Sequence, residues 1–266
     1  MCRWVSWMAV MAMATNAQAT EIIAHRGASY EAPENTVAAL KLAWKQSADA
    51  SEFDCMLSKD GKIVVIHDFD TKRTAGLDRK VIDQTLAELR TLDAGKWKSA
   101  DYLHEKIPTL KEMLDVVPAG KRLFIEIKCG VEIMPEFLRV LKERDLPPEK
   151  TAVISFHYNV VAAVKKARPD IKAYWIVSLR SAKGKEPPTA EDLIAKAKAA
   201  NLDGLDLSAS PILDAAFAKK VRDAALGLYV WTVNDAAEAR RLVGIGVDGI
   251  TTDRPGWLRE QLDKKP

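Results

Sequence analysis

Short apolar runs alternate with amphipathic stretches along the chain from residue 21 onward. Apolar residues are nearly continuous in the runs and recur every three or four positions in the stretches, which predicts buried parallel strands separated by helices. Eight such strands without a break in composition predict an α/β fold, a (β/α)8 TIM barrel, with a doubly wound open sheet as the competing architecture. The predicted strands are 21–25, 52–57, 123–128, 152–156, 173–179, 205–208, 228–233 and 247–252, and the predicted helices include 36–47, 110–117, 135–144, 160–167, 190–200, 214–225 and 236–243.

One pair of runs breaks this alternation. Segments 52–57 and 63–67 are separated by only five residues, 58–62, which is too short for a parallel crossover and predicts an antiparallel hairpin after the second strand. Asp60-Gly61 is a favoured two-residue hairpin turn. With that turn, the residue numbers of each opposed pair add to 121. Asp54 then lies opposite His67, which places a carboxylate beside an imidazole.

The chain is predicted to form one domain after a short leader. Residues 4–14 are apolar, Arg3 precedes them, and Ala17-Gln18-Ala19 follows with the small-residue spacing that signal peptidases cut. We therefore expect a signal peptide at 1–19, a single barrel domain at 20–266, and a periplasmic or secreted location. Segment 69–108 lacks a regular strand–helix period and is expected to be a small insertion that caps one end of the barrel.

Charge narrows the range of partners. The chain has 40 Lys and Arg against 37 Asp and Glu, a formal net charge of +3 without a long run of one sign. This balance gives no reason to expect nucleic acid as a partner. Beyond the N-terminal segment no apolar run is long enough to span a bilayer, so no stable membrane anchor is expected.

Charged residues at the ends of the predicted strands are the strongest chemical signal. Glu52 and Asp54 are two positions apart and share one face of their strand, as do Glu126 and Lys128. Buried charges are costly unless they pair or bind something. Because active sites of such barrels lie at the C-terminal strand ends, we expect the three acids to converge there and hold a hard divalent cation, Mg²⁺ or Ca²⁺. The alternative is a salt-bridge cluster of these acids with Lys128 and Arg26 and no metal.

Two histidines favour catalysis at the same end. His25 closes the first strand and His67 closes the hairpin. Imidazole titrates near neutral pH, so the pair suits general acid–base chemistry. A glycosidase barrel would also carry paired carboxylates, but it gives no reason for two imidazoles and two bases around them.

The ordered motifs resemble those of the glycerophosphodiester phosphodiesterase family, in its bacterial secreted type, over nearly the whole chain from about residue 21 to residue 255. The motifs that carry the resemblance are His25-Arg26-Gly27, Pro33-Glu34-Asn35-Thr36, Glu52-Phe53-Asp54, Lys59-Asp60-Gly61, His67-Asp68, Leu92-Asp93-Ala94-Gly95, Ile107-Pro108-Thr109-Leu110, Glu126-Ile127-Lys128, Trp231-Thr232-Val233-Asn234 and Asp248-Gly249-Ile250-Thr251-Thr252-Asp253.

This resemblance implies metal-dependent hydrolysis of glycerophosphodiesters to glycerol 3-phosphate and an alcohol. The metal would be held by the three acids, with His25 and His67 as acid and base in an order that the sequence leaves open. Arg26 and Lys128 would lie near the phosphate. The nucleophile, water or a glycerol hydroxyl, is also left open, as are the head group, the choice between Mg²⁺ and Ca²⁺, and the oligomeric state.

Several other residues have weaker predicted roles. Asn35 is expected to cap the first helix, with a direct contact to substrate as the alternative. Glu34 either orients Arg26 or stabilises the start of the helix. Trp231 either lines the substrate site or belongs to the barrel core. Asp253 is expected to cap the last helix. Cys55 and Cys129 are expected to be buried, reduced thiols facing the helix layer, with a disulfide between them as the alternative that export would favour.

Two alternative functions remain open. The first is a relative of these enzymes that uses the same site on lysophospholipid or phosphosphingolipid diesters. The second, of a different class, is a secreted barrel that binds its ligand and has lost turnover. Metal-dependent release of glycerol 3-phosphate would separate the enzyme from the binding protein.

Overall fold

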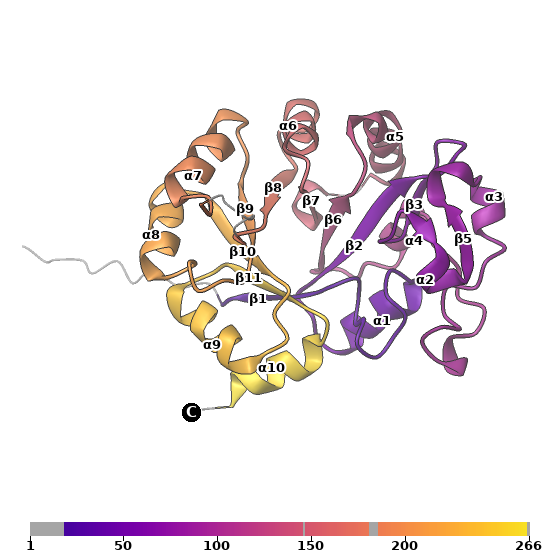
Figure 1. Cartoon of the computed structure of the whole chain (residues 1–266), viewed down its shortest axis with the longest axis horizontal. Helices are drawn as coiled ribbons and strands as arrows, with labels where there is room; N and C mark the ends of the chain where they lie inside the picture. The colour runs from indigo at the N-terminus through magenta and orange to yellow at the C-terminus, as the bar shows by residue number, and fades with distance from the viewer. Residues whose placement is uncertain (1–18, 146, 181–185, 265–266) are drawn as a thin grey trace, which may run out of the picture.

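The computed structural model describes residues 19–145, 147–180 and 186–264. It forms a closed ring of eight parallel strands with helices around the outside (Figure 1). The predicted signal peptide at 1–19 lies outside the described residues except for its last position. The barrel strands are β1 (Glu21–Ala24), β2 (Ala50–Leu57), β6 (Arg122–Ile127), β7 (Thr151–Ser155), β8 (Lys172–Val177), β9 (Gly204–Ser208), β10 (Gly227–Trp231) and β11 (Gly249–Thr252).

Pairing of the first strand closes the barrel. β1 pairs in parallel with β11, where Ala24 lies beside Thr252, and also with β2, where Ile23 lies beside Ala50. A doubly wound sheet would leave two open edges, so this double pairing confirms the barrel prediction. The outer helices are α1 (Val37–Lys45), α4 (Leu110–Asp115), α5 (Met134–Arg144), α6 (Tyr158–Ala167), α7 (Ala190–Ala199), α8 (Ala215–Asp223), α9 (Ala236–Ile245) and α10 (Pro255–Asp263).

Side-chain caps fix where several of these helices begin. Thr109 accepts from the backbone N–H of Glu112, whose carboxylate accepts from the Thr109 N–H in return, which completes a capping box at α4. The cap of α1 is Thr36, whose hydroxyl accepts from the N–H of Ala39. The expectation that Asn35 caps this helix is therefore wrong, and its side chain is free for another contact.

Aromatic side chains fill the barrel interior toward the amino ends of the strands. Phe124, Tyr174 and Tyr229 are buried, and their ring centroids lie 4.7 to 5.9 Å apart. This layer closes the barrel interior below the carboxyl ends of the strands. The interior is therefore a packed core, and the space for a ligand lies at the carboxyl end.

The hairpin after β2 is present, but its register differs from the prediction. β3 (Ile63–Val65) pairs antiparallel with β2, with Met56 opposite Val64, so paired positions add to 120 instead of 121. Within this loop only Gly61 has a positive φ, and the Gly61 N–H donates the turn hydrogen bond to the backbone oxygen of Ser58. The connection is thus a three-residue loop that ends in a left-handed glycine.

This register places Ile66 opposite Asp54, because the Ile66 N–H donates to the Asp54 carbonyl oxygen at 3.0 Å. The predicted pairing of Asp54 with His67 is therefore wrong. β3 ends at Val65, and His67 lies beyond the residues that pair with β2. Strand alternation therefore does not decide where the His67 side chain points.

The insertion lies at one side of the barrel against the hairpin (Figure 1). Met56, Val64 and Ile66 on one face of the hairpin pack against buried insertion residues that include Val81 and Leu89. This small separate core holds the insertion in place. Its elements are β4 (Asp70–Thr71), α2 (Lys72–Ala75), β5 (Leu77–Lys80), the short 3₁₀ turns Val81–Asp83 and Ala100–Tyr102, and α3 (Leu86–Leu89).

Cys55 and Cys129 are free thiols, as expected from their positions. Cys55 is fully buried in the layer between barrel and helices, and Cys129 is partly buried beside it. Among the described residues, no helix has both the length and the apolarity of a membrane span.

Candidate active site

Three carboxylates meet at the carboxyl end of neighbouring strands. Glu52 and Asp54 point inward from β2, and the register of β2 with β6 sets Asp54 directly beside Glu126. One oxygen from each acid lies within 4.8 Å of the others, and all three residues are buried. The predicted convergence of these acids is therefore observed.

The arrangement fits a cation. Three buried oxygens, Glu52 Oε1, Asp54 Oδ1 and Glu126 Oε1, lack a hydrogen-bond partner among the described residues. Two of these oxygens do face a cationic side chain, because Lys128 Nζ lies 3.2 Å from Glu126 Oε1 and 3.6 Å from Asp54 Oδ1, and this ammonium neutralises part of the charge. One carboxylate oxygen from each acid, all within 4.8 Å of one another, is the donor set that a hard divalent ion takes.

Without a cation, the three buried carboxyl groups are unfavourable in their charged forms, because they are desolvated and repel one another. Burial and the charge of Asp54 raise the pKa of Glu126 to about 7, and burial with the same neighbour raises the pKa of Glu52 well above its ordinary value. Burial alone would raise the pKa of Asp54 as well, but Arg26 and Lys128 outweigh it and hold that pKa below its ordinary value. Asp54 is thus the carboxylate that stays charged.

A left-handed turn after β1 brings Arg26 over the acids. Its φ is 55°, its N–H donates to Glu52 at 2.9 Å, and its Nε lies 3.2 Å from Asp54. Gly27 follows with φ of 81°, and a Cβ at that position would lie 2.5 Å from the backbone of Ala39. Glycine is therefore required here by both its conformation and the closeness of α1.

Asn35 also has a left-handed backbone, with φ of 60°, and contacts the acids instead of capping a helix. Its amide donates to Asp54 at 2.8 Å, and its oxygen accepts from the Asp54 N–H at 3.0 Å. This two-bond contact fixes the rotamer of Asp54. Glu34, next to it, accepts from Arg26 at 2.9 Å, in line with its expected orienting role.

His25 is held by a carboxylate from the last strand end. Its Nδ1 lies 2.6 Å from Asp253, which also accepts from Asn234 at 2.5 Å and Ser29 at 3.1 Å. Although burial would raise it, these contacts lower the pKa of Asp253 to about 2. Asp253 was expected to cap α10, but Arg254 precedes that helix, so the expectation is wrong. Its carboxylate orients the imidazole instead.

His67 lines the same cavity and has a different partner. Its Nδ1 lies 2.7 Å from Asp68, and Arg73 of the insertion donates to both Asp68 and Glu34 at 2.6 to 2.8 Å. Burial lowers the pKa of His67, and the charge of Arg26 adds to this, against the raising effect of Asp54. Arg73 connects the His67 side of the site to the Arg26 side.

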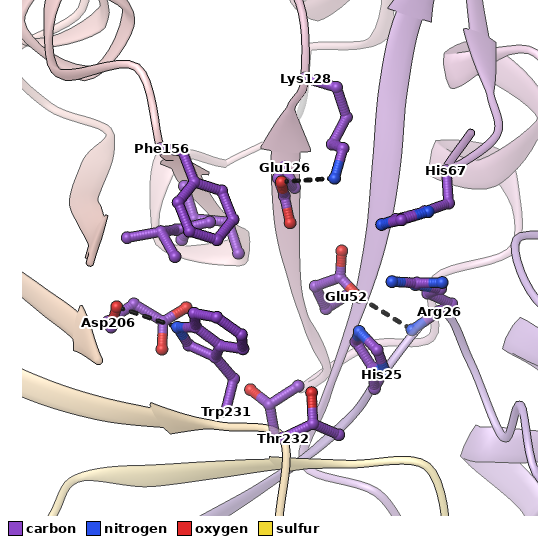
Figure 2. A pocket seen from close by; sticks show the side chains of 13 residues that line it. His25, Arg26, Glu52, His67, Glu126, Lys128, Phe156, Asp206, Trp231 and Thr232 are labelled. Atoms are coloured by element: carbon purple, nitrogen blue, oxygen red, sulfur yellow. Dashed lines mark hydrogen bonds and ion pairs between the residues drawn. The ribbon is translucent and has the colours of Figure 1, made fainter. Parts of the chain in front are cut away.

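These side chains line one cavity of about 160 Å³ at the mouth of the barrel (Figure 2). Its far wall is aromatic, because Phe156 and Trp231 meet edge to face with centroids 5.4 Å apart. The indole N–H of Trp231 donates to the backbone oxygen of Asp206 at 3.1 Å, which fixes the ring. Trp231 thus lies at the cavity and also contacts the core, so both sequence-based alternatives hold in part.

Sequence reasoning missed the partners of the histidines and one buried acid. Asp68 stood inside a quoted motif without an assigned role, and Arg73 stood in an irregular segment. Asp206 lies between Leu205 and Leu207 in a fully buried strand. A charge inside an apolar run is the signal that marked Glu52 and Asp54, and it was available at Asp206 too.

We expect the stability gained from a divalent cation to grow with pH. The raised pKa of Glu126, from an ordinary 4.5 to about 7, means that the folded protein binds this proton more tightly than the unfolded chain does. Stability of the metal-free protein is then full near pH 4.5 and falls as pH rises through about 7. At about 100 times its Kd a metal adds about 2.7 kcal/mol, or roughly 5–10 °C in Tm. Thermal melting with and without metal from pH 5 to 8 checks this, and a constant or narrowing gap contradicts it.

Asp253→Asn is expected to slow turnover without unfolding the protein. The amide keeps the size but loses the charge that holds His25, so kcat should fall at least tenfold and at most by the roughly 10²–10⁴ that loss of a general acid or base costs. The pH profile of kcat should shift as well. Asp235→Asn is the matched control, because Asp235 caps α9 and asparagine caps equally well. Equal effects of both substitutions would assign Asp253 a purely structural role.

The fold and the site together define a barrel enzyme with an acidic triad between two basic residues and two oriented imidazoles. The profile of the glycerophosphoryl diester phosphodiesterase family matches residues 25–257. The chain belongs to this family, and it is an enzyme of the phosphoric diester hydrolase type.

Individual relatives are similar over most of their length. The glycerophosphodiester phosphodiesterase of Caldanaerobacter subterraneus subsp. tengcongensis is 35% identical over 246 residues, covering 90% of this chain and 96% of the relative. Among solved structures, an Oleispira antarctica phosphodiesterase in complex with the product sn-glycerol-3-phosphate has a TM-score of 0.81 at 32% identity and covers 92% of this chain and 98% of its own. A glycerophosphodiester phosphodiesterase from Agrobacterium tumefaciens has a TM-score of 0.77 at 26% identity and covers 91% and 99%.

Proposed function

We propose that this enzyme hydrolyses glycerophosphodiesters to glycerol 3-phosphate and an alcohol in a reaction that depends on a divalent cation. The observation that carries the proposal is the convergence of three buried acids, with one oxygen of each within 4.8 Å of the others, beside Arg26 and Lys128. A phosphodiester is anionic, and a site for it needs more positive charge than two bases supply against three acids. A bound cation corrects that balance.

Glu52, Asp54 and Glu126 would hold the cation. All-carboxylate oxygen donors favour Mg²⁺ or Ca²⁺ over softer metals. When bound, the ion neutralises charge that develops on the phosphoryl oxygens. Arg26 and Lys128 add two cationic groups on the same side of the cavity, where they would bind and orient the phosphate.

His25 and His67 would move the protons. The leaving alkoxide needs a general acid, and the nucleophile, water or a glycerol hydroxyl, needs a general base on the other side. With Nδ1 of each ring engaged by a carboxylate, Nε2 is the nitrogen available for proton transfer. The two histidines line one cavity, so both can reach the same bound phosphodiester.

The surroundings of the two rings favour one order of roles. Burial lowers the pKa of His67, and Arg26 and Lys128 lower it further against the raising effect of Asp54, while the charge of its partner Asp68 is shared with Arg73. The net result favours neutral imidazole, the form that a base needs. Asp253 is paired with His25, and its other described hydrogen-bond partners are uncharged, so its charge is not shared with another basic side chain. We therefore propose His67 as base and His25 as acid.

The direct test is an assay of residues 20–266 on glycerophosphocholine and glycerophosphoethanolamine, with Mg²⁺ or Ca²⁺ and with excess chelator. Glycerol 3-phosphate release that stops on chelation and returns with added metal supports the proposal. Full activity under chelation overturns the metal assignment. Tight binding of glycerol 3-phosphate without turnover under any metal would instead identify a binding protein.

An apolar groove next to the site favours a second substrate class. It has a volume of about 510 Å³, meets the active site at Lys128, and is lined by Met56, Leu57, Phe69 and Ile82 among others. Phe69 and Ile82 are 65% and 53% exposed, so both present apolar surface to the groove. A single acyl chain would fit such a groove, so lysophosphatidylcholine belongs in the same assay. Turnover comparable to that of glycerophosphocholine would support this alternative.

We also propose that the protein is exported to the periplasm or secreted. The support is the apolar N-terminal segment that ends in Ala17-Gln18-Ala19. Expression with the natural N-terminus and sequencing of the released protein is expected to give Thr20 as the first residue. Retention of Met1 in the released protein would contradict cleavage.

A further inference from the structure

Asp206 lies at the cavity but takes no part in the proposed cation binding, phosphate binding or proton transfer. Asp206 points inward from β9, because Leu205 and Leu207 on either side belong to the outer core layer. It is 2% exposed, and its register neighbours are Ile176 on β8 and Tyr229 on β10. It lines the same cavity as Glu52 and Glu126 (Figure 2).

The carboxyl group of Asp206 lacks a partner. Its Oδ1 is buried without a hydrogen bond, and within the described ranges no Lys, Arg or His forms an ion pair with it. A buried polar group without a hydrogen bond destabilises the folded protein. The other acids of the cavity have basic neighbours, whereas Asp206 is placed so that a ligand must supply the missing hydrogen bonds.

The walls around Asp206 restrict which ligand fits. Ile154, Ile176 and the rings of Phe156 and Trp231 are apolar, so they suit the C–H faces of a short carbon chain. The phosphate end of a ligand is drawn to Arg26 and Lys128 in the same small cavity. A chain that is apolar along its faces, anionic at one end and hydroxylated at the other satisfies all of these surfaces.

We propose that Asp206 is a specificity-determining residue that accepts hydrogen bonds from the free hydroxyls of the glycerol unit, an inference that rests on the proposed function. The glycerol unit is the part common to all glycerophosphodiesters, and its hydroxyls need partners once they are buried. The head group then extends toward the open side of the cavity. Asp206 makes the enzyme selective for diol-bearing phosphodiesters.

The test compares two competitive inhibitors of the same size, glycerol 3-phosphate and propyl phosphate, which differ only in two hydroxyls. The unaltered protein should bind glycerol 3-phosphate roughly 10- to 100-fold more tightly, as expected for hydrogen bonds to a charged or strongly polar group. This measurement needs no variant. Equal inhibition constants overturn the proposal.

Variants then assign the preference to Asp206. Asp206→Leu should remove it, while Asp206→Asn, which keeps an acceptor oxygen, should retain most of it. Glu21→Gln, which neutralises an acid at the opposite end of the barrel, is the control and should leave the ratio of the two constants unchanged. Thermal melting checks that each variant is folded. A preference that survives in folded Asp206→Leu overturns the assignment.

A cationic head group is the competing occupant. If Asp206→Asn weakens glycerophosphocholine but leaves glycerophosphoglycerol unaffected, the carboxylate binds an ammonium group and the diol proposal is wrong. Failure of the proposed function gives a different pattern, because glycerol 3-phosphate would then be preferred over propyl phosphate without any metal-dependent turnover. If the enzyme shows metal-dependent turnover but glycerol 3-phosphate and propyl phosphate have equal inhibition constants, the diol proposal is wrong and the proposed function stands.

Discussion

Glu126→Gln and Glu52→Gln are each expected to lower kcat/KM by about three orders of magnitude. Each substitution removes one charged ligand from the triad, and a bound cation contributes several kcal/mol of charge stabilisation in the transition state. The same substitutions should raise the Tm of the metal-free protein, since burial and the charge of Asp54 raise the pKa of both carboxyl groups. Isosteric neutralisation relieves that repulsion. Loss of turnover with a gain in metal-free stability is the expected signature.

Glu21→Gln is the matched control. Glu21 is also a partly buried barrel acid, but it lies at the opposite end of β1 and pairs with Arg122 at 2.7 Å. Its neutralisation should leave kcat unchanged, because Glu21 does not line the cavity that holds the triad side chains Glu52 and Glu126. Calorimetric titration with Mg²⁺ and Ca²⁺ completes the test. If Glu126→Gln binds metal and turns over like the unaltered protein, the triad is not the cation site.

His25→Ala and His67→Ala are each expected to lower kcat by about 10²–10⁴ on glycerophosphocholine. The unaltered protein should show a bell-shaped pH dependence, and the double variant should be no worse than either single one, because the two rings act as a unit. His104→Asn is the control, since His104 is distant from the cavity lining and has a φ of 72°, which asparagine tolerates. Near-normal turnover of either alanine variant would show that histidine to be structural.

A better leaving group separates the two roles. p-Nitrophenolate leaves without being protonated, so an enzyme that lacks its general acid recovers activity on a p-nitrophenyl phosphodiester, whereas one that lacks its base does not. We expect recovery for His25→Ala and none for His67→Ala. The reverse pattern would exchange the two roles and would show that the charges around His67 do not decide them.

Strand chemistry explains why much of the site could be predicted. Glu52, Asp54 and Glu126 were found because alternation fixes the face of each strand residue, and because charges in apolar runs are costly without partners. The closed barrel then brought them within 4.8 Å of one another. The general placement of Arg26 and Lys128 near the same mouth followed from the same reasoning.

Loop geometry explains the errors. The hairpin register was wrong by one residue, because a three-residue loop and a two-residue turn read alike in Lys59-Asp60-Gly61. Asn35 was taken for a cap because its residue type favours caps, whereas its left-handed backbone turns it toward Asp54. A single residue of register or one φ angle redirects a side chain, and neither is visible in composition.

The sequence by itself determined the order of strands and helices, the inward faces of the strands and the acids they carry, because these depend on local periodicity. Only the tertiary structure decided which distant residues meet. Closure of β1 against β11 places the residues that follow Ala24 and Thr252 side by side, and this gives His25 its partner Asp253. Packing of the insertion on the hairpin likewise delivers Arg73 to Asp68. Such contacts join residues far apart in the chain, so they arise from packing and closure and leave no local pattern.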